Sequence, residues 1–167
     1  MCSIDLSKAF DKVNHHALFI KLMKRHIPVC LLELLEFWLS NSWSCIKWFD
    51  VYSPFFNIFF GVRQGSVLSP LLFAVYLNDL VDGRYNGRHS FVILYADDIL
   101  ILTSSLTELQ RLLHVCEKEL TWLDMSINIS KSCCLHIGPR FDYKCCSVLT
   151  ISGLPLSWAT ELRYLGI

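Results

Sequence analysis

The feature that most constrains this chain is a pair of adjacent aspartates between two short apolar runs. Asp97 and Asp98 are preceded by residues 91–96 and followed by residues 99–102, and both runs are rich in apolar side chains. Two such runs separated by a polar break predict a β-hairpin with buried arms. The arms then hold two carboxylates rigidly at the tip of the hairpin.

Two carboxylates at one hairpin tip repel each other. At a separation of about 4 Å the repulsion is roughly 4 kcal/mol at an effective dielectric constant of 20, and a bound cation would relieve it. Oxygen ligands select hard cations, which favours Mg²⁺ or Mn²⁺. A plain polar turn is the alternative, because Asp tolerates turn conformations well. Asp5 ends another short apolar strand and favours the metal, since a third carboxylate would complete a two-metal site for in-line phosphoryl displacement.

The composition of the 167 residues is typical of one globular domain. Hydrophobic residues make up 53% of the chain and the mean hydropathy is +0.42, which predicts a large core and some apolar surface that expects a partner. The apolar runs fall short of the about 20 residues that a membrane-spanning helix needs. No membrane contact and no secretion signal are expected, so the protein is predicted to be intracellular. The net charge of zero is weak for a chain that binds nucleic-acid phosphates unaided.

Eight cysteines raise the question of disulfides or a metal site. A chain of this size without a secretion signal favours free, buried thiols. Two cysteine pairs with a histidine between them suggest zinc: Cys133-Cys134, His136 and Cys145-Cys146. However, adjacent side chains of a strand point to opposite faces, and the usual two-residue spacer is missing. The spacing therefore disfavours zinc.

Hydrophobic periodicity and turn residues predict a mixed order of elements. The expected elements are a strand over 2–6, helices over 15–26 and 29–40, two strands within 44–62, a loop over 61–69, a helix over 69–80, a hairpin over 91–102, an amphipathic helix capped near 105, and strands around 133–137, 147–151 and 163–165. This order indicates an α+β fold, with an antiparallel sheet and helices packed on one of its faces.

Five segments, in this order, resemble the conserved motifs of reverse transcriptases. Residues 5–11 look like motif A, 61–70 like motif B, 95–98 like motif C, 128–131 like motif D, and 162–167 like the motif E grip for the primer strand. The residues of these motifs are most similar to those of reverse transcriptases from non-long-terminal-repeat, LINE-like retrotransposons. The resemblance covers nearly the whole chain. The resemblance implies a polymerase palm with a ferredoxin-like core. Residues 1–167 would then be one reverse transcriptase domain, truncated at both ends and lacking the fingers and thumb.

The resemblance also implies roles for the carboxylates. Asp5, Asp97 and Asp98 would be the catalytic metal ligands, holding two Mg²⁺ (or Mn²⁺) ions that bridge the primer 3′ hydroxyl and the triphosphate. Phe10 would be a steric gate against the 2′ carbon of the incoming sugar, excluding ribonucleotides. A plain core position is the alternative for Phe10, and the flanking acids Asp5 and Asp11 favour the gate.

Other residues are assigned by the same resemblance. Gln64 and Gly65 would lie along the template base and the sugar, because a glycine lets the backbone approach closely. Arg63 would contact phosphate, and Tyr95 is counted with the substrate-binding residues. Lys131 occupies a position that would protonate the pyrophosphate leaving group, as a general acid; a surface lysine is the alternative.

The resemblance implies RNA-templated DNA synthesis during retrotransposon replication, with an RNA template, a DNA primer and deoxynucleoside triphosphates as partners. A functional enzyme of this kind is expected in the nucleus. The alternative is a catalytically inactive remnant that binds at most nucleic acid or a partner. A viral RNA-templated RNA polymerase is disfavoured, because its turn usually reads Gly-Asp-Asp and its sugar-sensing residue is normally polar, unlike Tyr95-Ala96 and Phe10.

Overall fold

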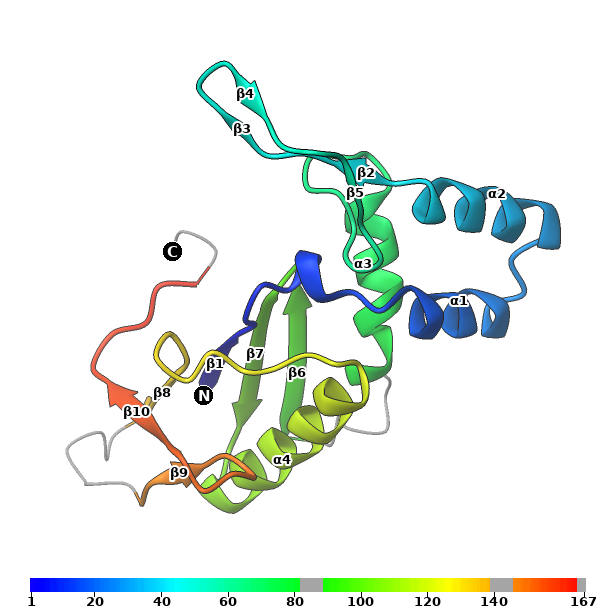
Figure 1. Cartoon of the computed structure of the whole chain (residues 1–167). Coiled ribbons are helices and arrows are strands. Elements are labelled where there is room, and N and C mark those ends of the chain that lie inside the picture. The colour runs from blue at the N-terminus through cyan, green and yellow to red at the C-terminus, as the bar shows by residue number, and fades with distance from the viewer. Residues whose placement is uncertain (82–88, 139–145, 165–167) are drawn as a thin grey trace. The chain divides into compact units, whose positions relative to one another are not determined.

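The structure is a computed structural model that describes residues 1–81, 89–138 and 146–164 (Figure 1). The chain divides into two compact units. The first unit contains Met1–Ala9 and the described part of Leu77–Ile167, and the second contains Phe10–Tyr76. Across the described residues, no helix is long and apolar enough to cross a membrane.

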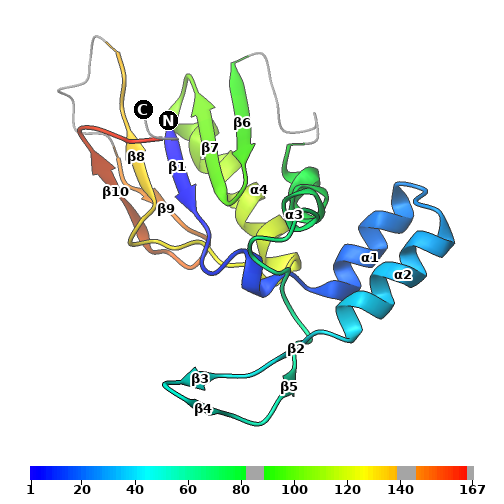
Figure 2. The same cartoon turned by 90° about the horizontal axis from the view of Figure 1, so that it is seen from above.

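The first unit is built on a mixed six-stranded sheet. Its strands are β1 (Cys2–Asp5), β6 (Ser90–Tyr95), β7 (Asp98–Thr103), β8 (Cys133–Leu135), β9 (Val148–Leu149) and β10 (Pro155–Ala159). They lie in the order β6-β7-β1-β8-β10-β9, so β1 runs between β7 and β8 (Figure 2). The pairs are antiparallel except β8 and β10, which are parallel. The expected α+β fold is confirmed. The sheet was expected to be antiparallel, but it is mixed, because β8 and β10 are parallel.

One face of the sheet forms the core of the first unit. Ile4 of β1 is paired with Ile99 of β7, and both are fully buried. The amphipathic helix α4 (Leu106–Trp122) packs against β7 and β9 on this face. Its buried side chains recur at helical spacing: Leu109, Leu112, Leu113, Cys116 and Leu120. In this unit the helix that packs on the sheet is α4, whereas several helices were expected on that face.

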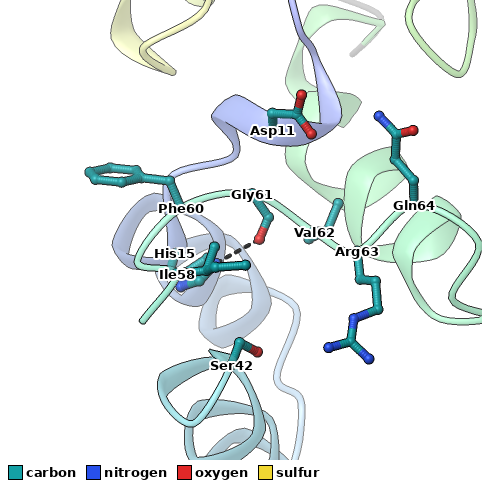
Figure 3. Close-up of a pocket in the computed structure, with 9 residues that line it drawn as sticks. All are labelled: Asp11, His15, Ser42, Ile58, Phe60, Gly61, Val62, Arg63 and Gln64. Atoms are coloured by element: carbon teal, nitrogen blue, oxygen red, sulfur yellow. Dashed lines mark hydrogen bonds between the residues drawn. The ribbon is translucent and has the colours of Figure 1, made fainter. Parts of the chain in front are cut away.

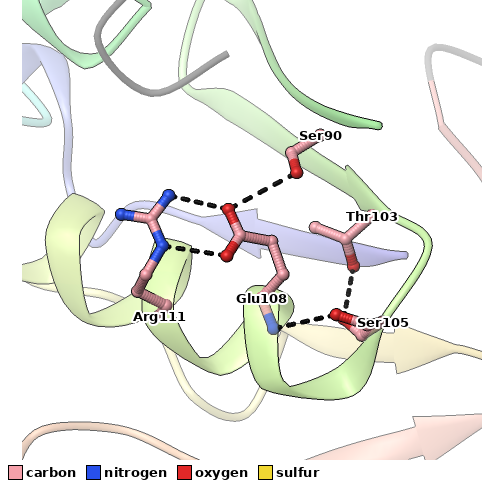
Figure 4. A network of polar contacts seen from close by, with 5 residues as sticks. All are labelled: Ser90, Thr103, Ser105, Glu108 and Arg111. Carbon is pink, nitrogen blue, oxygen red and sulfur yellow. Dashed lines mark hydrogen bonds and ion pairs between the residues drawn. The ribbon is translucent and has the colours of Figure 1, made fainter. Parts of the chain in front are cut away.

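A polar network fixes the start of α4 to the hairpin (Figure 4). The hydroxyl of Ser105, the N-cap residue, accepts a hydrogen bond from the Glu108 amide at 3.2 Å, as the capping-box pattern predicted. The Glu108 carboxylate accepts hydrogen bonds from both Arg111 Nη2 at 2.7 Å and Ser90 Oγ at 3.4 Å. Arg111 lowers the pKa of Glu108. Thr103 Oγ1 donates to the Ser105 carbonyl at 3.0 Å, which joins the end of β7 to the same cap.

The second unit is mainly helical, with a long, irregular hairpin. Its elements are the 3₁₀ helix η1 (Phe10–Lys12), helices α1 (His15–Lys24), α2 (Val29–Ser40) and α3 (Ser69–Leu77), and strands β2 (Trp43–Ser44), β3 (Lys47–Trp48), β4 (Val51–Tyr52) and β5 (Phe56–Asn57). Helix α3 continues as the 3₁₀ helix η2 (Asn78–Leu80) in the first unit. Fully buried Tyr76 connects α3 to α1 and to the residue before it. Its hydroxyl accepts a hydrogen bond from the Asn14 amide at 3.2 Å, and its carbonyl accepts one from Lys21 Nζ at 2.5 Å.

Large apolar side chains of the second unit are exposed. They are concentrated on α2 and on the hairpin, where Trp48 and Phe49 are 73% and 83% exposed. Others in these elements include Leu34, Phe37, Trp43, Val51, Phe55 and Phe59. Soluble proteins rarely expose so much clustered apolar surface. This is the apolar surface that the high mean hydropathy led us to expect.

Several elements differ from the sequence-based prediction. The first helix ends at Lys24, before His26, whose φ of 57° is left-handed. In place of two strands within 44–62, four two-residue strands lie between Trp43 and Asn57, because β2 pairs with β5 and β3 with β4; the chain turns at Phe49 and Asp50. Strand β10 was not predicted. No strand includes Arg163, and the rest of that predicted strand reaches into residues outside the described ranges.

Candidate active site

The β-sheet register brings two of the predicted carboxylates together. Asp5, the last residue of β1, is paired with Asp98, the first residue of β7, and Asp98 is also paired with Tyr95 of β6. Directly opposed residues of antiparallel strands have Cβ atoms roughly 5 Å apart on the same face of the sheet. Asp5, Asp98 and Tyr95 therefore form a row across three strands, at the end of the sheet where the hairpin turns.

Asp97 lies in the two-residue turn between β6 and β7. The turn begins with Ala96 at a φ of 51°, a left-handed conformation that an L-residue rarely adopts. Positive φ at the first of two hairpin positions is a feature of the tight primed turns that match the twist of the strands. The expected hairpin with two carboxylates at its end is thus present, and neither Asp97 nor Asp98 is fully buried.

The three carboxylates interact electrostatically. Partial burial raises the pKa of Asp98, and the charges of Asp97 and Asp5 raise it further. The pKa of Tyr164 is raised by burial and by the charge of Asp98. Like charges gathered at one place favour a cation, and an all-oxygen donor set suits a hard divalent ion. As the side chains stand, no three His, Cys, Asp or Glu residues of the described ranges are grouped closely enough to hold a metal together.

The backbone of Asp5 is fixed by a fully buried serine that the sequence analysis missed. Ser132 Oγ accepts a hydrogen bond from the Asp5 amide at 3.1 Å and donates one to the Asn128 carbonyl at 2.7 Å. The Asn128 amide in turn donates to the Asp5 carbonyl at 2.8 Å. Segment 128–131, which resembles motif D, and the adjacent Ser132 therefore hold the strand end that carries Asp5. No feature of the sequence distinguishes Ser132 from other serines.

Lys131 and Tyr164 lie in the same unit as the carboxylates. Lys131 is exposed in the turn after Asn128, and within the described residues its ammonium group makes no hydrogen bond or ion pair. Tyr164 was included only as part of the motif E resemblance. Its hydroxyl is buried and has no hydrogen-bond partner among the described residues. Because the charge of Asp98 affects it, Tyr164 is a further candidate residue of the carboxylate end.

The remaining predicted residues belong to the second unit. The Phe10 ring stacks on Phe73 with centroids 4.5 Å apart and planes 17° from parallel. The Phe10 carbonyl accepts a hydrogen bond from the Val62 amide at 2.8 Å. The Gly61 amide donates to the Val13 carbonyl at 2.8 Å, and His15 Nε2 lies 2.7 Å from the Gly61 carbonyl. The start of the motif B loop is therefore attached to the segment that carries Phe10.

A cavity of about 560 Å³ opens beside this attachment (Figure 3). Its lining combines charged, polar and apolar side chains: Asp11, His15, Ser42, Ile58, Phe60, Gly61, Val62, Arg63 and Gln64. Arg63 and Gln64 point away from each other, with Gln64 on the side of Asp11. The Arg63 carbonyl accepts a hydrogen bond from Ser69 Oγ at 2.6 Å, which fixes the loop to the start of α3.

The two glycines of this loop have different surroundings. Both have positive φ, 84° at Gly61 and 82° at Gly65. A Cβ atom at Gly61 would lie 2.9 Å from the Asp11 carbonyl oxygen, whereas no atom of the described residues lies within 4 Å of a Cβ at Gly65. Close approach of two backbones thus requires glycine at position 61, whereas the described surroundings of Gly65 impose no such requirement.

Comparisons with known proteins agree with the motif pattern. The model of the family described as reverse transcriptase (RNA-dependent DNA polymerase) matches residues 1–167. The RNA-directed DNA polymerase from mobile element jockey of Drosophila funebris is 30% identical over 177 aligned positions, and the match covers 99% of this chain. The probable RNA-directed DNA polymerase from transposon BS of Drosophila melanogaster is 32% identical over 182 residues, covering 98% of the chain. The chain spans only 19% of the length of either relative.

A relative from another type of element matches over the same span. The retrovirus-related Pol polyprotein from type-1 retrotransposable element R2 of Nasonia vitripennis is 28% identical over 180 residues. Those residues cover 98% of this chain and 18% of the relative. The similarity therefore extends across several kinds of transposable element, and in each case it concerns one part of a much longer protein.

Proposed function

Since the chain belongs to the reverse transcriptase family, we propose that it forms the polymerase palm for RNA-templated DNA synthesis in a non-long-terminal-repeat retrotransposon. In this proposal, residues 1–167 are one reverse transcriptase domain with a ferredoxin-like palm core. Other parts of the full-length protein supply the fingers and the thumb. The template is RNA, the primer is DNA, and the incoming substrates are deoxynucleoside triphosphates.

The observation that carries the proposal is the pairing of Asp5 with Asp98 beside Asp97. Membership of the family implies the use of divalent metal ions. Asp5, Asp97 and Asp98 would hold two Mg²⁺ or Mn²⁺ ions, since oxygen ligands and mutual repulsion both favour a hard cation. When bound, such ions neutralise the charge that develops on the phosphoryl oxygens and activate the primer 3′ hydroxyl. Ser132 holds the Asp5 backbone in place for this role.

Each remaining residue has a role in the proposal. Phe10, fixed against Phe73, would exclude the 2′ hydroxyl of a ribonucleotide. Arg63 would contact phosphate, while Gln64 and Gly65 lie along the template base and the sugar. Tyr95, 62% exposed in the row with Asp98, would contact the substrate beside the metals.

Lys131 would protonate the pyrophosphate as it leaves. Its exposed ammonium group is free to take up this position when substrate is bound. An ammonium group within reach of the leaving oxygen can donate a proton to it as the bond to phosphorus breaks.

A catalytically inactive remnant that binds a partner is the second candidate. The exposed apolar side chains of α2 and of the hairpin favour a binding role, because surface of this kind is normally covered by another part of a protein. This candidate needs no metal at the carboxylate end. Metal binding therefore separates the two proposals.

The test measures Mn²⁺ binding to the purified chain by titration calorimetry, with Mg²⁺ as a competitor. Asp98→Asn and Asp5→Asn should each weaken Mn²⁺ binding about tenfold or more, because each removes a charged ligand. Asp50→Asn is the matched control, since Asp50 is exposed in the hairpin turn of the other unit. Equal Mn²⁺ affinity in all four proteins would contradict the proposed metal site.

Primer extension on an RNA template tests polymerase activity directly. We expect no extension by the isolated chain, because positioning of the reactants contributes about 7–11 kcal/mol and most of the full-length protein is absent. The control is the chain with both Asp97→Ala and Asp98→Ala. Robust extension that this control abolishes would show that the chain polymerises unaided.

A further inference from the structure

Two cysteines of the first unit face each other across neighbouring strands. Cys2 of β1 is paired with Cys134 of β8 in the antiparallel register. In the preceding pair, the Met1 nitrogen donates to the Leu135 carbonyl and the Leu135 amide donates to the Met1 carbonyl, both at 2.8 Å. Hydrogen-bonded and non-hydrogen-bonded pairs alternate along an antiparallel ladder, so Cys2 and Cys134 form a non-hydrogen-bonded pair.

This position suits a covalent bridge. Non-hydrogen-bonded pairs have Cα atoms about 4.5 Å apart, inside the roughly 4.4–6.8 Å range that disulfides span. Both side chains are fully buried and directed to the same face of the sheet. Cys133, the adjacent residue, is only half-buried and lies on the opposite face, so it cannot replace Cys134 without a change of register.

The two sulfur atoms are chemically unequal. A hydrogen bond from the Cys2 thiol lowers the pKa of Cys134, while the same interaction and burial raise the pKa of Cys2. Thiolate character determines which sulfur reacts with an oxidant. Cys134 is therefore the attacking sulfur, and Cys2 is positioned to resolve the product.

We propose that Cys2 and Cys134 form a reversible oxidation site, which closes to a cross-strand disulfide on reaction with a peroxide. Cys134 Sγ attacks a peroxide oxygen; the O–O bond breaks, a sulfenic acid forms, and the departing oxygen leaves as water. Cys2 Sγ then attacks the sulfenyl sulfur; the S–S bond forms, the S–O bond breaks, and the second oxygen leaves as water. The two thiols lose two electrons in total, and the peroxide gains them.

The location of the bridge gives the oxidation a structural consequence. Strand β1 carries Asp5 three residues beyond Cys2, and the segment before β8 carries Ser132, which holds the Asp5 amide. A bridge between Cys2 and Cys134 ties these two segments covalently. Both cysteines are fully buried, so reaction with peroxide requires local opening of the β1–β8 pair and is slower than oxidation of exposed Cys30.

The experiment oxidises the purified, fully reduced chain with hydrogen peroxide, blocks remaining thiols with N-ethylmaleimide and maps bridges by tryptic digestion and mass spectrometry. The expected product joins peptide 1–8 to peptide 132–140, with the loss of two hydrogen atoms, and dithiothreitol reverses it. This bridge should exceed all other bridges by roughly tenfold, because among the described cysteines only Cys2 and Cys134 lie directly opposite each other on paired strands. It closes a loop of about 130 residues, so the oxidised chain should unfold roughly 10 °C higher than the reduced chain.

Two variants provide matched tests. Cys133→Ser should keep the bridge, whereas Cys134→Ser should abolish it while preserving a small side chain with a hydrogen-bond donor. Oxidation in denaturant should give mixed bridges, which separates the folded geometry from chance pairing. The proposal is overturned if Cys2 and Cys134 remain free thiols that react with N-ethylmaleimide once oxidation by peroxide has gone to completion, or if Cys133 is the main partner of Cys2. Neither outcome depends on polymerase activity.

Discussion

Replacing Gly61 by alanine should be one of the most damaging conservative changes in the second unit. The residue has a φ of 84°, where an L-residue costs on the order of 1 kcal/mol more than glycine. A Cβ atom would also lie 2.9 Å from the Asp11 carbonyl oxygen and 3.0 Å from the Phe10 carbonyl oxygen. These are backbone atoms, so relief requires the two segments to separate, at about 1–3 kcal/mol.

Separation would also weaken the hydrogen bonds that attach the loop. The Gly61 amide donates to Val13 and the Val62 amide to Phe10, both at 2.8 Å, and each bond contributes about 1 kcal/mol net. We therefore expect Gly61→Ala to lower the free energy of unfolding by about 3–5 kcal/mol in total. Urea unfolding followed by far-ultraviolet circular dichroism measures this change, with the slope against urea checked for constancy.

Gly65→Ala is the matched control, because it separates the strain of positive φ from the steric overlap. Gly65 has nearly the same φ, 82°, but none of the described atoms lies within 4 Å of an added Cβ. This variant should lose only about 1 kcal/mol. Equal losses in the two variants, or a loss at Gly61 of about 1 kcal/mol or less, would refute the inference that close backbone contact requires glycine there.

Three further changes test other parts of the structure. Asp98→Asn should raise the free energy of unfolding near pH 7, because the raised pKa of Asp98 means that ionisation of its carboxyl group opposes folding. This stabilisation should disappear as the pH falls to 3.8, the ordinary pKa of an aspartate. A stabilisation that does not change with pH in urea unfolding would contradict the charge interaction. Ser105→Ala removes the N-cap of α4 and should cost about 1 kcal/mol in thermal or urea unfolding, while Ser104→Ala, next to the cap, should cost little. In a full-length polymerase carrying this palm, Phe10→Val should relax selection against ribonucleotides; an unchanged incorporation ratio of ribo- to deoxyribonucleotides would leave Phe10 as a packing residue of Phe73.

Local patterns in the sequence predicted the elements that local physics determines. The hairpin around Asp97 and the helix capped by Ser105 were correct, because alternation, helical spacing and capping chemistry act over a few residues. Strand β10 was missed because it begins with Pro155, shortly after Gly153, and both residues are typical of turns. Its parallel pairing with β8 joins segments distant in sequence and leaves no local pattern.

In the candidate site too, features that depend on local sequence were predicted, and features that depend on contacts between distant segments were not. The carboxylates were found because acidic side chains at the ends of apolar strands are unusual and costly. The role of Ser132 depends on the register between β1 and the segment before β8, which a single sequence does not reveal. Likewise, the hydrogen bonds from Gly61 to Val13 and from Val62 to Phe10 join positions 48 and 52 residues apart in the sequence, and only the folded backbone brings them together.

The place of β1 in the sheet has a consequence for synthesis of the protein on the ribosome. This strand is made well before its two neighbours, β7 and β8, which begin only at Asp98 and Cys133. At typical rates of about 5–20 residues per second, β1 waits roughly 5–20 s before even β7 has been made. During that time both edges of an apolar strand are unpaired and open to wrong partners. Slower translation would prolong this exposure, so soluble yield should depend on the rate of synthesis and on chaperones that shield β1.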